Sequence, residues 1–206
     1  MNKSIVDLLT PDNIKKVSIK KNYKLFNSPE VNVWGVRAED LTPDIFNDII
    51  LTFMFDGCDV QKIEVFEATT DPGKNGMLSP ENKDGIAILN EGQYLDTWTV
   101  GIHKTYDALV QAKDITVTRD DNKDLVLDVK SKKKSKAYGI NIHRASAYNV
   151  LDKVGPYSQG CQVINSALQY SKFLSNVRNA LRIAKKKYVS YTLINQKDLR
   201  DVASNG

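Results

Sequence analysis

Two kinds of side chain that can do covalent chemistry near neutral pH are scarce in this chain. It has two cysteines, Cys58 and Cys161, and two histidines, His103 and His143. His143 precedes Cys161 by 18 positions. A free thiol has a pKa near ~8.5 and becomes an attacking thiolate when a nearby imidazole takes its proton. This spacing predicts nucleophilic catalysis, with Cys161 as the nucleophile and His143 as its base.

The order of these two residues disfavours two common layouts of cysteine peptidases. In papain-like enzymes the cysteine comes first and the histidine lies far downstream, whereas in caspase-like enzymes the histidine precedes the cysteine by about 50 residues. Here the histidine comes first and the gap is short. The pair therefore indicates a different class of thiol enzyme.

The residues around Cys161 carry a recognisable motif. The segment reads Ser158-Gln159-Gly160-Cys161, and His143 lies 15 positions before Ser158. This pattern resembles the catalytic motif of the L,D-transpeptidase (YkuD-like) family, a histidine followed after about fifteen residues by Ser/Thr-His-Gly-Cys. The resemblance implies that Cys161 forms the acyl-enzyme with His143 as base. It also implies that Ser158, Gln159 and Gly160 belong to the catalytic segment, with backbone amides near Gly160 forming an oxyanion site.

Two positions depart from the family pattern. Gln159 stands where the family has a second histidine, and Val163 stands where it has arginine or asparagine. A glutamine amide still offers an N–H donor to an oxyanion. Valine offers no polar group with which to contact a substrate. The resemblance therefore supports the reaction class more directly than it supports a substrate.

Three short segments also resemble phage-encoded candidate peptidoglycan hydrolases. They are TTDPG at 69–73, NIHRAS at 141–146 and the SxGCQV pattern at 158–163, and the resemblance spans about residues 33–170. It implies bacterial peptidoglycan as the partner and hydrolysis of stem or cross-bridge peptides as the reaction, as in an endolysin. Residues 1–13 show no export signal, because Asp7, Pro11 and Asp12 interrupt any apolar run. We therefore expect residence in the host cytoplasm until holin-dependent release, or travel with the virion.

Two alternatives remain open at this stage. The same acyl-enzyme resolved by an amine would make the protein an L,D-transpeptidase that forms or exchanges cross-links. A chain that has lost the second motif histidine could instead be a non-catalytic wall-binding or virion structural module. Faster alkylation of Cys161 than of Cys58 would favour an enzyme, because the thiolate is the reactive form.

Four further residues are candidates for substrate binding. Arg144 and Ser146 follow the predicted base, and a guanidinium can meet a carboxylate with two hydrogen bonds. Tyr157 is a candidate wall of the cleft. His103 is a candidate lining residue, although a lone histidine after a strand is more often structural. Surface exposure or core packing is the alternative for each of them.

The sequence predicts no metal and no organic cofactor. No pair among Cys58, His103, His143 and Cys161 has the short spacing typical of zinc ligands. The net charge is +4, and a lysine cluster lies at 130–136. Because no aromatic residues alternate with these lysines, we predict a solvated loop and no nucleic-acid partner.

Composition and length favour one folded catalytic domain over 1–206, with a core at about 30–195, a short N-terminal extension and a polar C-terminal tail. The chain has 206 residues, of which 41% are hydrophobic and 26% charged, as in average globular proteins. The longest nearly apolar stretch, 49–55, is far shorter than the ~20 residues that cross a bilayer. We therefore predict no membrane insertion. Nothing in the sequence sets the oligomeric state.

The elements that position the motif are mostly predicted strands. Residues 17–25 alternate like a strand, and 49–55 and 62–68 flank Asp56-Gly57, a strong hairpin signal. Apolar residues at spacings of three and four predict one amphipathic helix over 164–184, directly after Cys161, and a closing strand follows at 188–193. The predicted fold class is mainly β, a β-rich α+β fold. The family resemblance adds the expectation of a sheet or sandwich.

Overall fold

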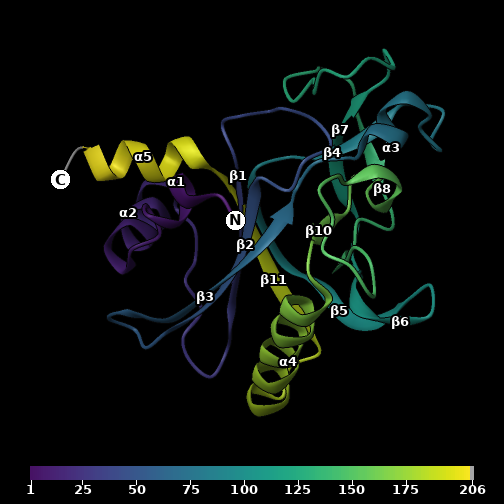
Figure 1. Ribbon diagram of the computed structural model, residues 1–206. Helices are drawn as coiled ribbons and strands as arrows, with labels where there is room; N and C mark the ends of the chain where they lie inside the picture. Colours follow the sequence, from purple (N-terminus) through teal and green to yellow (C-terminus); the bar gives the residue numbers. More distant parts are fainter. Residues whose placement is uncertain (205–206) are drawn as a thin grey trace.

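The computed structural model describes residues 1–204 and confirms a β-rich α+β fold (Figure 1). Eight strands form a closed barrel. In barrel order they are β1 (Asn32–Arg37), β11 (Tyr188–Asn195), β5 (Gly92–His103), β6 (Tyr106–Gln111), β9 (Ile142–Arg144), β10 (Gln162–Ile164), β3 (Val60–Thr69) and β2 (Asp48–Phe55). Where the resemblance implied a sheet or sandwich, the parallel pairing of β1 with β11 closes the sheet on itself.

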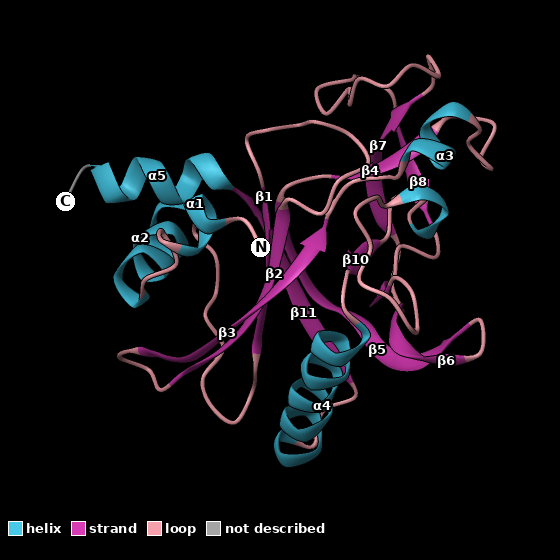
Figure 2. Cartoon of the chain, in the orientation of Figure 1, coloured by secondary structure: helices cyan, strands magenta, loops and turns pink. Residues whose placement is uncertain are grey.

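A second, smaller sheet packs beside the barrel, at the upper right of Figure 2. It contains β4 (Ile86–Leu89), β7 (Ile115–Asp120) and β8 (Lys134–Ala137) in the order β4-β7-β8, all antiparallel. Leu89 and Val117 of this sheet join Ile142 and Ile164 of the barrel in the main hydrophobic core. The short helix α3 (Lys74–Leu78) precedes β4. The small sheet is thereby fixed against the barrel strands that carry the motif.

The amphipathic helix predicted after Cys161 is confirmed as α4 (Ala167–Ala184). Of the first three predicted residues, Ile164 instead ends β10, where it pairs with β9 and β3, and the helix begins only after Ser166. Ser166 caps the helix by accepting a hydrogen bond from the Gln169 N–H. Tyr170, Phe173 and Val177 are buried in the main core. The helix therefore anchors the chain that leaves the cysteine.

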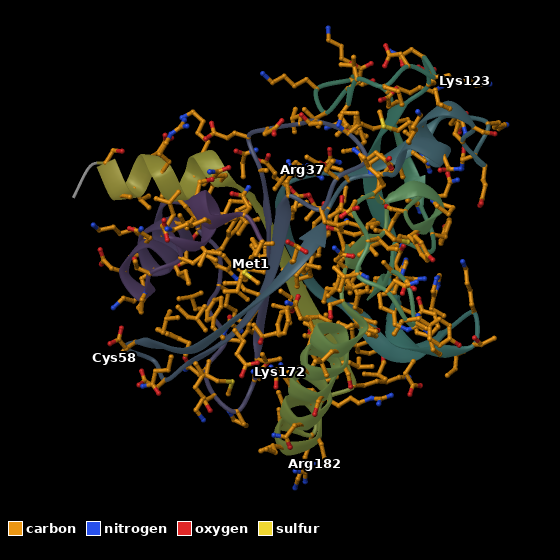
Figure 3. All side chains as sticks on the ribbon, in the orientation of Figure 1. Met1, Arg37, Cys58, Lys123, Lys172 and Arg182 are labelled. Atoms are coloured by element: carbon orange, nitrogen blue, oxygen red, sulfur yellow. The ribbon has the colours of Figure 1, made fainter. Side chains whose placement is uncertain are left out.

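The hairpin predicted around Asp56-Gly57 is also confirmed, as β2 and β3. Asp56 closes the turn by accepting hydrogen bonds from the N–H groups of Cys58 and Asp59 at 2.9 and 2.7 Å. Cys58 is exposed at the tip of this hairpin, and Figure 3 shows it at the outer edge of the molecule. The predicted closing strand is β11.

The strand predicted over 17–25 is wrong, because most of these residues belong to the helix α2 (Pro11–Lys21), which follows a short helix α1 (Lys3–Val6). Thr10 caps α2 through the Asn13 N–H, and Pro11 occupies the first turn, where its missing N–H costs nothing. Ile14 and Val17 are buried three positions apart. The alternation after Val17 is incidental to this helical spacing.

Both chain ends contribute to a second hydrophobic core, contrary to the expectation of an extension and a polar tail. The C-terminal helix α5 (Gln196–Ser204) packs against α2. Ile14 and Leu199 from these helices are fully buried with Trp34 of β1 and Ile194 of β11. The tail looked polar because only one stripe of α5 is apolar, which is enough to cover one face of a sheet.

The buried side chain of Arg37 bonds to residues at the ends of several strands. Arg37, at the end of β1, is 3% exposed and its Nε lies 2.8 Å from a carboxylate oxygen of Asp71. Its Nη2 donates to the backbone carbonyls of Thr70 and Leu89 at 3.2 and 3.0 Å. Figure 3 labels Arg37 in the interior, near the ends of β1 and β4. One cation thus joins β1, the segment after β3, and β4.

Asp48 extends this buried network. It accepts hydrogen bonds from the Ala38 N–H at 2.7 Å, and from the N–H and hydroxyl of Thr70 at 2.6 and 2.8 Å. Burial, together with the nearby charge of Asp71, raises the pKa of Asp48 to about 7. Gln162 donates to the Thr70 carbonyl at 3.3 Å, which connects the network to the residue after Cys161.

Replacement of Arg37 should therefore destabilise the whole fold. We expect Arg37→Met to lower the free energy of unfolding by about 3–5 kcal/mol, because it leaves buried carboxylates without their cation. The matched control is Arg200→Met, which breaks the exposed ion pair with Glu39 and should cost less than about 1 kcal/mol. Urea denaturation measures both. Equal losses in the two variants would contradict the role assigned to Arg37.

Candidate active site

Cys161 comes directly before β10, the strand that pairs with the strand β9 carrying His143. β9 and β10 are parallel, with Val163 opposite His143. Ile142 and Ile164 point into the main core, whereas Cys161 and Val163 belong to a separate small cluster. Because strand residues alternate between faces, His143 points to the same side as Cys161. Strand alternation thus directs the side chain of the predicted base to the face of the wall on which Cys161, at the start of the next strand, lies.

Cys161 lines a cleft of about 500 Å³ between the barrel and the small sheet, whereas His143 is not among the residues that line it. The barrel side includes His103, Asn141 and Cys161, and Gln159 lies beside them. The small-sheet side and its flanking loops contribute Glu81, Asn82, Gly85, Ile86, Ala87, Arg119, Lys136 and Ala137. A molecule in the cleft can therefore reach the thiol while contacting both sheets.

Backbone atoms of the segment before β9 fix the Cys161 thiol. The thiol donates to the carbonyl of Gly139 at 3.3 Å and accepts a hydrogen bond from the Asn141 N–H at 3.4 Å. Burial raises the pKa of Cys161 to about 11, although the Asn141 N–H acts in the opposite direction. At neutral pH the Cys161 side chain is therefore a protonated thiol.

His143 is held as a neutral imidazole with a defined proton position. Its Nδ1 lies 2.7 Å from the carbonyl oxygen of Arg144, which can only accept, so Nδ1 carries the proton. The Tyr106 hydroxyl lies 3.2 Å from the same Nδ1 and donates to the same carbonyl at 3.2 Å. Burial lowers the pKa of His143 to about 4. Nε2 therefore keeps its lone pair at neutral pH, as a general base requires.

Ser158 and Gly160 shape the turn that presents Cys161. The Ser158 hydroxyl donates to the carbonyl of Cys161 at 2.9 Å and accepts from the Gly160 N–H at 3.2 Å. This use of the Gly160 N–H differs from the oxyanion role expected for it. Gly160 adopts φ +116°, and a Cβ there would lie 2.6 Å from the Ala87 carbonyl oxygen. Glycine is thus needed for both conformation and close packing.

The TTDPG segment, residues 69–73, packs against this turn and is hydrogen-bonded to it. The N–H of Gly73 donates to the carbonyl of Ser158 at 3.0 Å. A Cβ on Gly73 would lie 2.1 Å from the Gly155 carbonyl oxygen, in the short 3-10 helix Gly155–Tyr157 that leads into the motif. The side chain of Gln159 lines the cleft and packs beside Gly76. The two motifs that lie far apart in the sequence are therefore packed together.

The four predicted substrate residues occupy different places. His103 lines the cleft. The Arg144 guanidinium lies 4.0 Å from the centre of the Tyr106 ring. The Ser146 hydroxyl accepts from two N–H groups of the turn that follows it, both at 3.1 Å. Tyr157 packs against the small apolar cluster that contains Cys161. Of the four, His103 is the one that the structure brings to the cleft.

Two residues of the site were missed in the sequence. Asn141 lies two positions before His143, so the alternation of the strand could have placed it on the same face. Tyr106 pairs with His103 across the β5–β6 hairpin. The turn between them contains Lys104 at φ +57°, a conformation that lysine rarely adopts. This hairpin carries none of the usual turn residues, so the sequence did not reveal it.

Residues 1–204 contain no group of three or more His, Cys, Asp or Glu side chains arranged to hold a metal ion. Over the same residues, no helix has both the length and the apolar character needed to cross a bilayer.

Comparisons with known proteins found no match: no family model, no curated protein and no solved structure is similar to this chain. The assignment of chemistry therefore depends on the geometry of the site and on the motif resemblance.

The close packing of Gly160 generates a stability prediction. Gly160→Ala should destabilise the protein more than Gly57→Ala, although both glycines have similar positive φ angles of +116° and +101°. A Cβ at Gly57 meets only Asn27 at 3.9 Å, so that variant should cost about 1–2 kcal/mol from backbone strain alone. Thermal and urea denaturation of both variants measure the difference. Equal costs would show that contact with Ala87 is unimportant.

The burial of Cys161 reverses the labelling order expected from the sequence. Cys58 is exposed, whereas Cys161 is 8% exposed and protonated at neutral pH. Iodoacetamide should therefore alkylate Cys58 first at pH 7.5, and labelling of Cys161 should rise steadily as pH approaches 11. Mass spectrometry of tryptic peptides distinguishes the two sites, and Cys58→Ser isolates Cys161. Rapid labelling of Cys161 at pH 7 would instead indicate a resting thiolate.

Proposed function

We propose that this protein is a cysteine-dependent enzyme that hydrolyses peptide bonds of bacterial peptidoglycan through an acyl-enzyme on Cys161. One observation carries the proposal: the Cys161 thiol lines a cleft directly before β10, and the neighbouring strand β9 carries a neutral histidine whose Nδ1 proton leaves Nε2 as an acceptor. A structural cysteine needs neither a cleft nor an oriented base.

The reaction begins with a neutral thiol and a neutral imidazole. His143 Nε2 takes the proton of Cys161 as the sulfur attacks the substrate carbonyl carbon, so charge appears only along the reaction path. The Arg144 carbonyl stabilises the resulting imidazolium through Nδ1–H, and Tyr106 fixes the position of that carbonyl. The imidazolium then protonates the leaving nitrogen. Water, deprotonated by His143, then attacks the thioester carbon, the bond from carbon to the Cys161 sulfur breaks, and the imidazolium returns the proton to the thiolate.

The substrate class is supported by the motif resemblance and by charged groups near the thiol. Glu81 lines the cleft. Lys104 lies close enough for its charge to lower the pKa of Cys161, against the larger effect of burial. Peptidoglycan stem peptides carry both carboxylates and amines, so a cleft lined by the acidic Glu81 and the basic Arg119 and Lys136 suits them. By the same resemblance, we propose a phage enzyme that reaches the wall by release from the host cytoplasm or with the virion.

Purified peptidoglycan tests this proposal. Incubation with the protein should produce new stem-peptide fragments by mass spectrometry. These should vanish with Cys161→Ala and persist with the matched control Cys58→Ala. New cross-links or exchanged terminal residues would instead establish a transpeptidase. No change across several wall chemistries, with wild-type protein folded, would refute an enzyme and favour a wall-binding or structural module.

The pH dependence of catalysis follows from the state of His143. Because burial lowers its pKa to about 4, the base form persists down to acidic pH. We expect kcat/KM to be flat from about pH 5 to 9 and to fall about tenfold per unit below about pH 4. Burial of neutral His143 also weakens folding as pH falls below its ordinary value, so circular dichroism at each pH is the control. An acidic limb near pH 6.5 would contradict the buried neutral base.

A further inference from the structure

The second histidine of the chain lies directly against the first. The rings of His103 and His143 are stacked, with centroids 4.4 Å apart and an angle of 17° between their planes. His103 is at the end of β5 and lines the same cleft as Cys161. A packing role accounts for the stack but not for the polar contact that orients the His103 ring.

Asn141 fixes the orientation and the tautomer of His103. The Oδ1 of Asn141 accepts a hydrogen bond from the Gln111 N–H at 3.0 Å, so its Nδ2 is the end that faces His103. This Nδ2 lies 3.1 Å from His103 Nδ1. An amide nitrogen can only donate, so Nδ1 must accept. Neutral His103 therefore carries its proton on Nε2.

The surroundings also keep His103 neutral. A proton on Nδ1 would oppose the Asn141 amide, because two donors would then face each other. Burial, with a contribution from the charge of Lys104, lowers the pKa of His103 below its ordinary value. The stacked His143 becomes positive during the proposed reaction, which further disfavours a second positive ring. Among residues 1–204, the structure shows no hydrogen-bond partner for His103 Nε2.

The two imidazoles thus have opposite tautomers. His143 is protonated on Nδ1 and presents an acceptor at Nε2, whereas His103 is protonated on Nε2 and presents a donor. The Gly160 N–H, which was the expected oxyanion donor, is already bonded to Ser158. Asn141 orients His103 through its side chain and also donates its backbone N–H to the Cys161 thiol. The His103 ring is therefore connected to the Cys161 thiol through a single residue, Asn141.

We propose that His103 is a catalytic residue that stabilises the oxyanion through Nε2–H. This inference rests on the proposed acyl transfer. When the Cys161 sulfur bonds to the carbonyl carbon, the π electrons move to the carbonyl oxygen. His103 donates a hydrogen bond to that oxygen and transfers no proton. When the carbon–nitrogen bond breaks, the electrons return to re-form the carbonyl, and the leaving nitrogen takes its proton from His143.

A first experiment tests the tautomers without any substrate. The chain contains only two histidines, so nitrogen-15 NMR of the imidazoles gives two separate ring systems. His103→Phe assigns them. At pH 7 we expect one ring protonated on Nε2, lost in His103→Phe, and one protonated on Nδ1. A His103 ring protonated on Nδ1, or on both nitrogens, would overturn the inference.

A second experiment separates His103 from the thiol chemistry, in a Cys58→Ser background. Acylation of Cys161 by p-nitrophenyl acetate forms an oxyanion, whereas alkylation by iodoacetamide does not. His103→Phe keeps an aromatic ring against His143 but removes the donor. It should slow acylation roughly 10²–10³-fold and change alkylation by less than about twofold. His103→Gln, which restores an N–H donor, should recover part of the loss.

The outcomes distinguish a failure of the proposed acyl transfer at Cys161 from a failure of the role proposed for His103. Wild-type protein that is folded but never acylated at Cys161 would refute the proposed function itself. Acylation of the wild type that is unaffected by His103→Phe would refute only the role of His103. Equal slowing of acylation and alkylation would also refute it, because His103 would then act through the thiol or His143 rather than on the oxyanion.

Discussion

The buried charge of Arg37 is the constraint on which the arrangement of the site depends. A guanidinium removed from water must be matched by anions and acceptors. Asp71 and the carbonyls of Thr70 and Leu89 meet this need, and Asp48 holds Thr70 in place. These groups come from segments far apart in the sequence. The ends of β1, β3 and β4 are consequently brought to one point, and the small sheet is fixed to the barrel there.

The position of Cys161, the proposed nucleophile, follows from that point. Asp71 opens the turn whose Gly73 supports Ser158, and Ser158 ties together the turn that ends at Cys161. On the other side, Gln162 bonds to the Thr70 carbonyl. Cys161 therefore lies between two connections to the buried network. Its thiol is oriented by backbone atoms, which gives a fixed position without a charged partner.

The site combines rigid positioning with neutral resting groups. Burial disfavours charge on both the thiol and His143. Such a pair carries no charge at rest, and the thiol loses its proton only as it attacks a carbonyl in the proposed reaction. Three barrel elements supply the polar groups: the β5–β6 hairpin carries His103 and Tyr106, β9 carries His143, and the turn before β10 carries Cys161. The small sheet supplies the opposite wall of the cleft.

Short-range patterns in the sequence were sufficient for several features. Asp56-Gly57 determined the hairpin, and the spacing of apolar residues determined α4. The rarity and spacing of His143 and Cys161 identified two residues that the structure places on β9 and directly before its neighbour β10. Each of these depends on interactions within a few residues or on residue chemistry alone. The alternation after Val17 predicted a strand wrongly, because α2 is stabilised by its cap at Thr10 and by burial of Ile14 and Val17 in the second hydrophobic core.

Only the tertiary structure decided how these pieces work together. Barrel closure depends on pairing β1 with β11, which are separated by most of the chain. The tautomers of His103 and His143 depend on Asn141, Gln111 and the Arg144 carbonyl, and no sequence pattern specifies such partners. The sequence by itself determined which groups could react and which local elements carry them. Contacts between distant segments decided their protonation, their orientation and the cleft they face, because burial and hydrogen-bond partners exist only once the chain has folded.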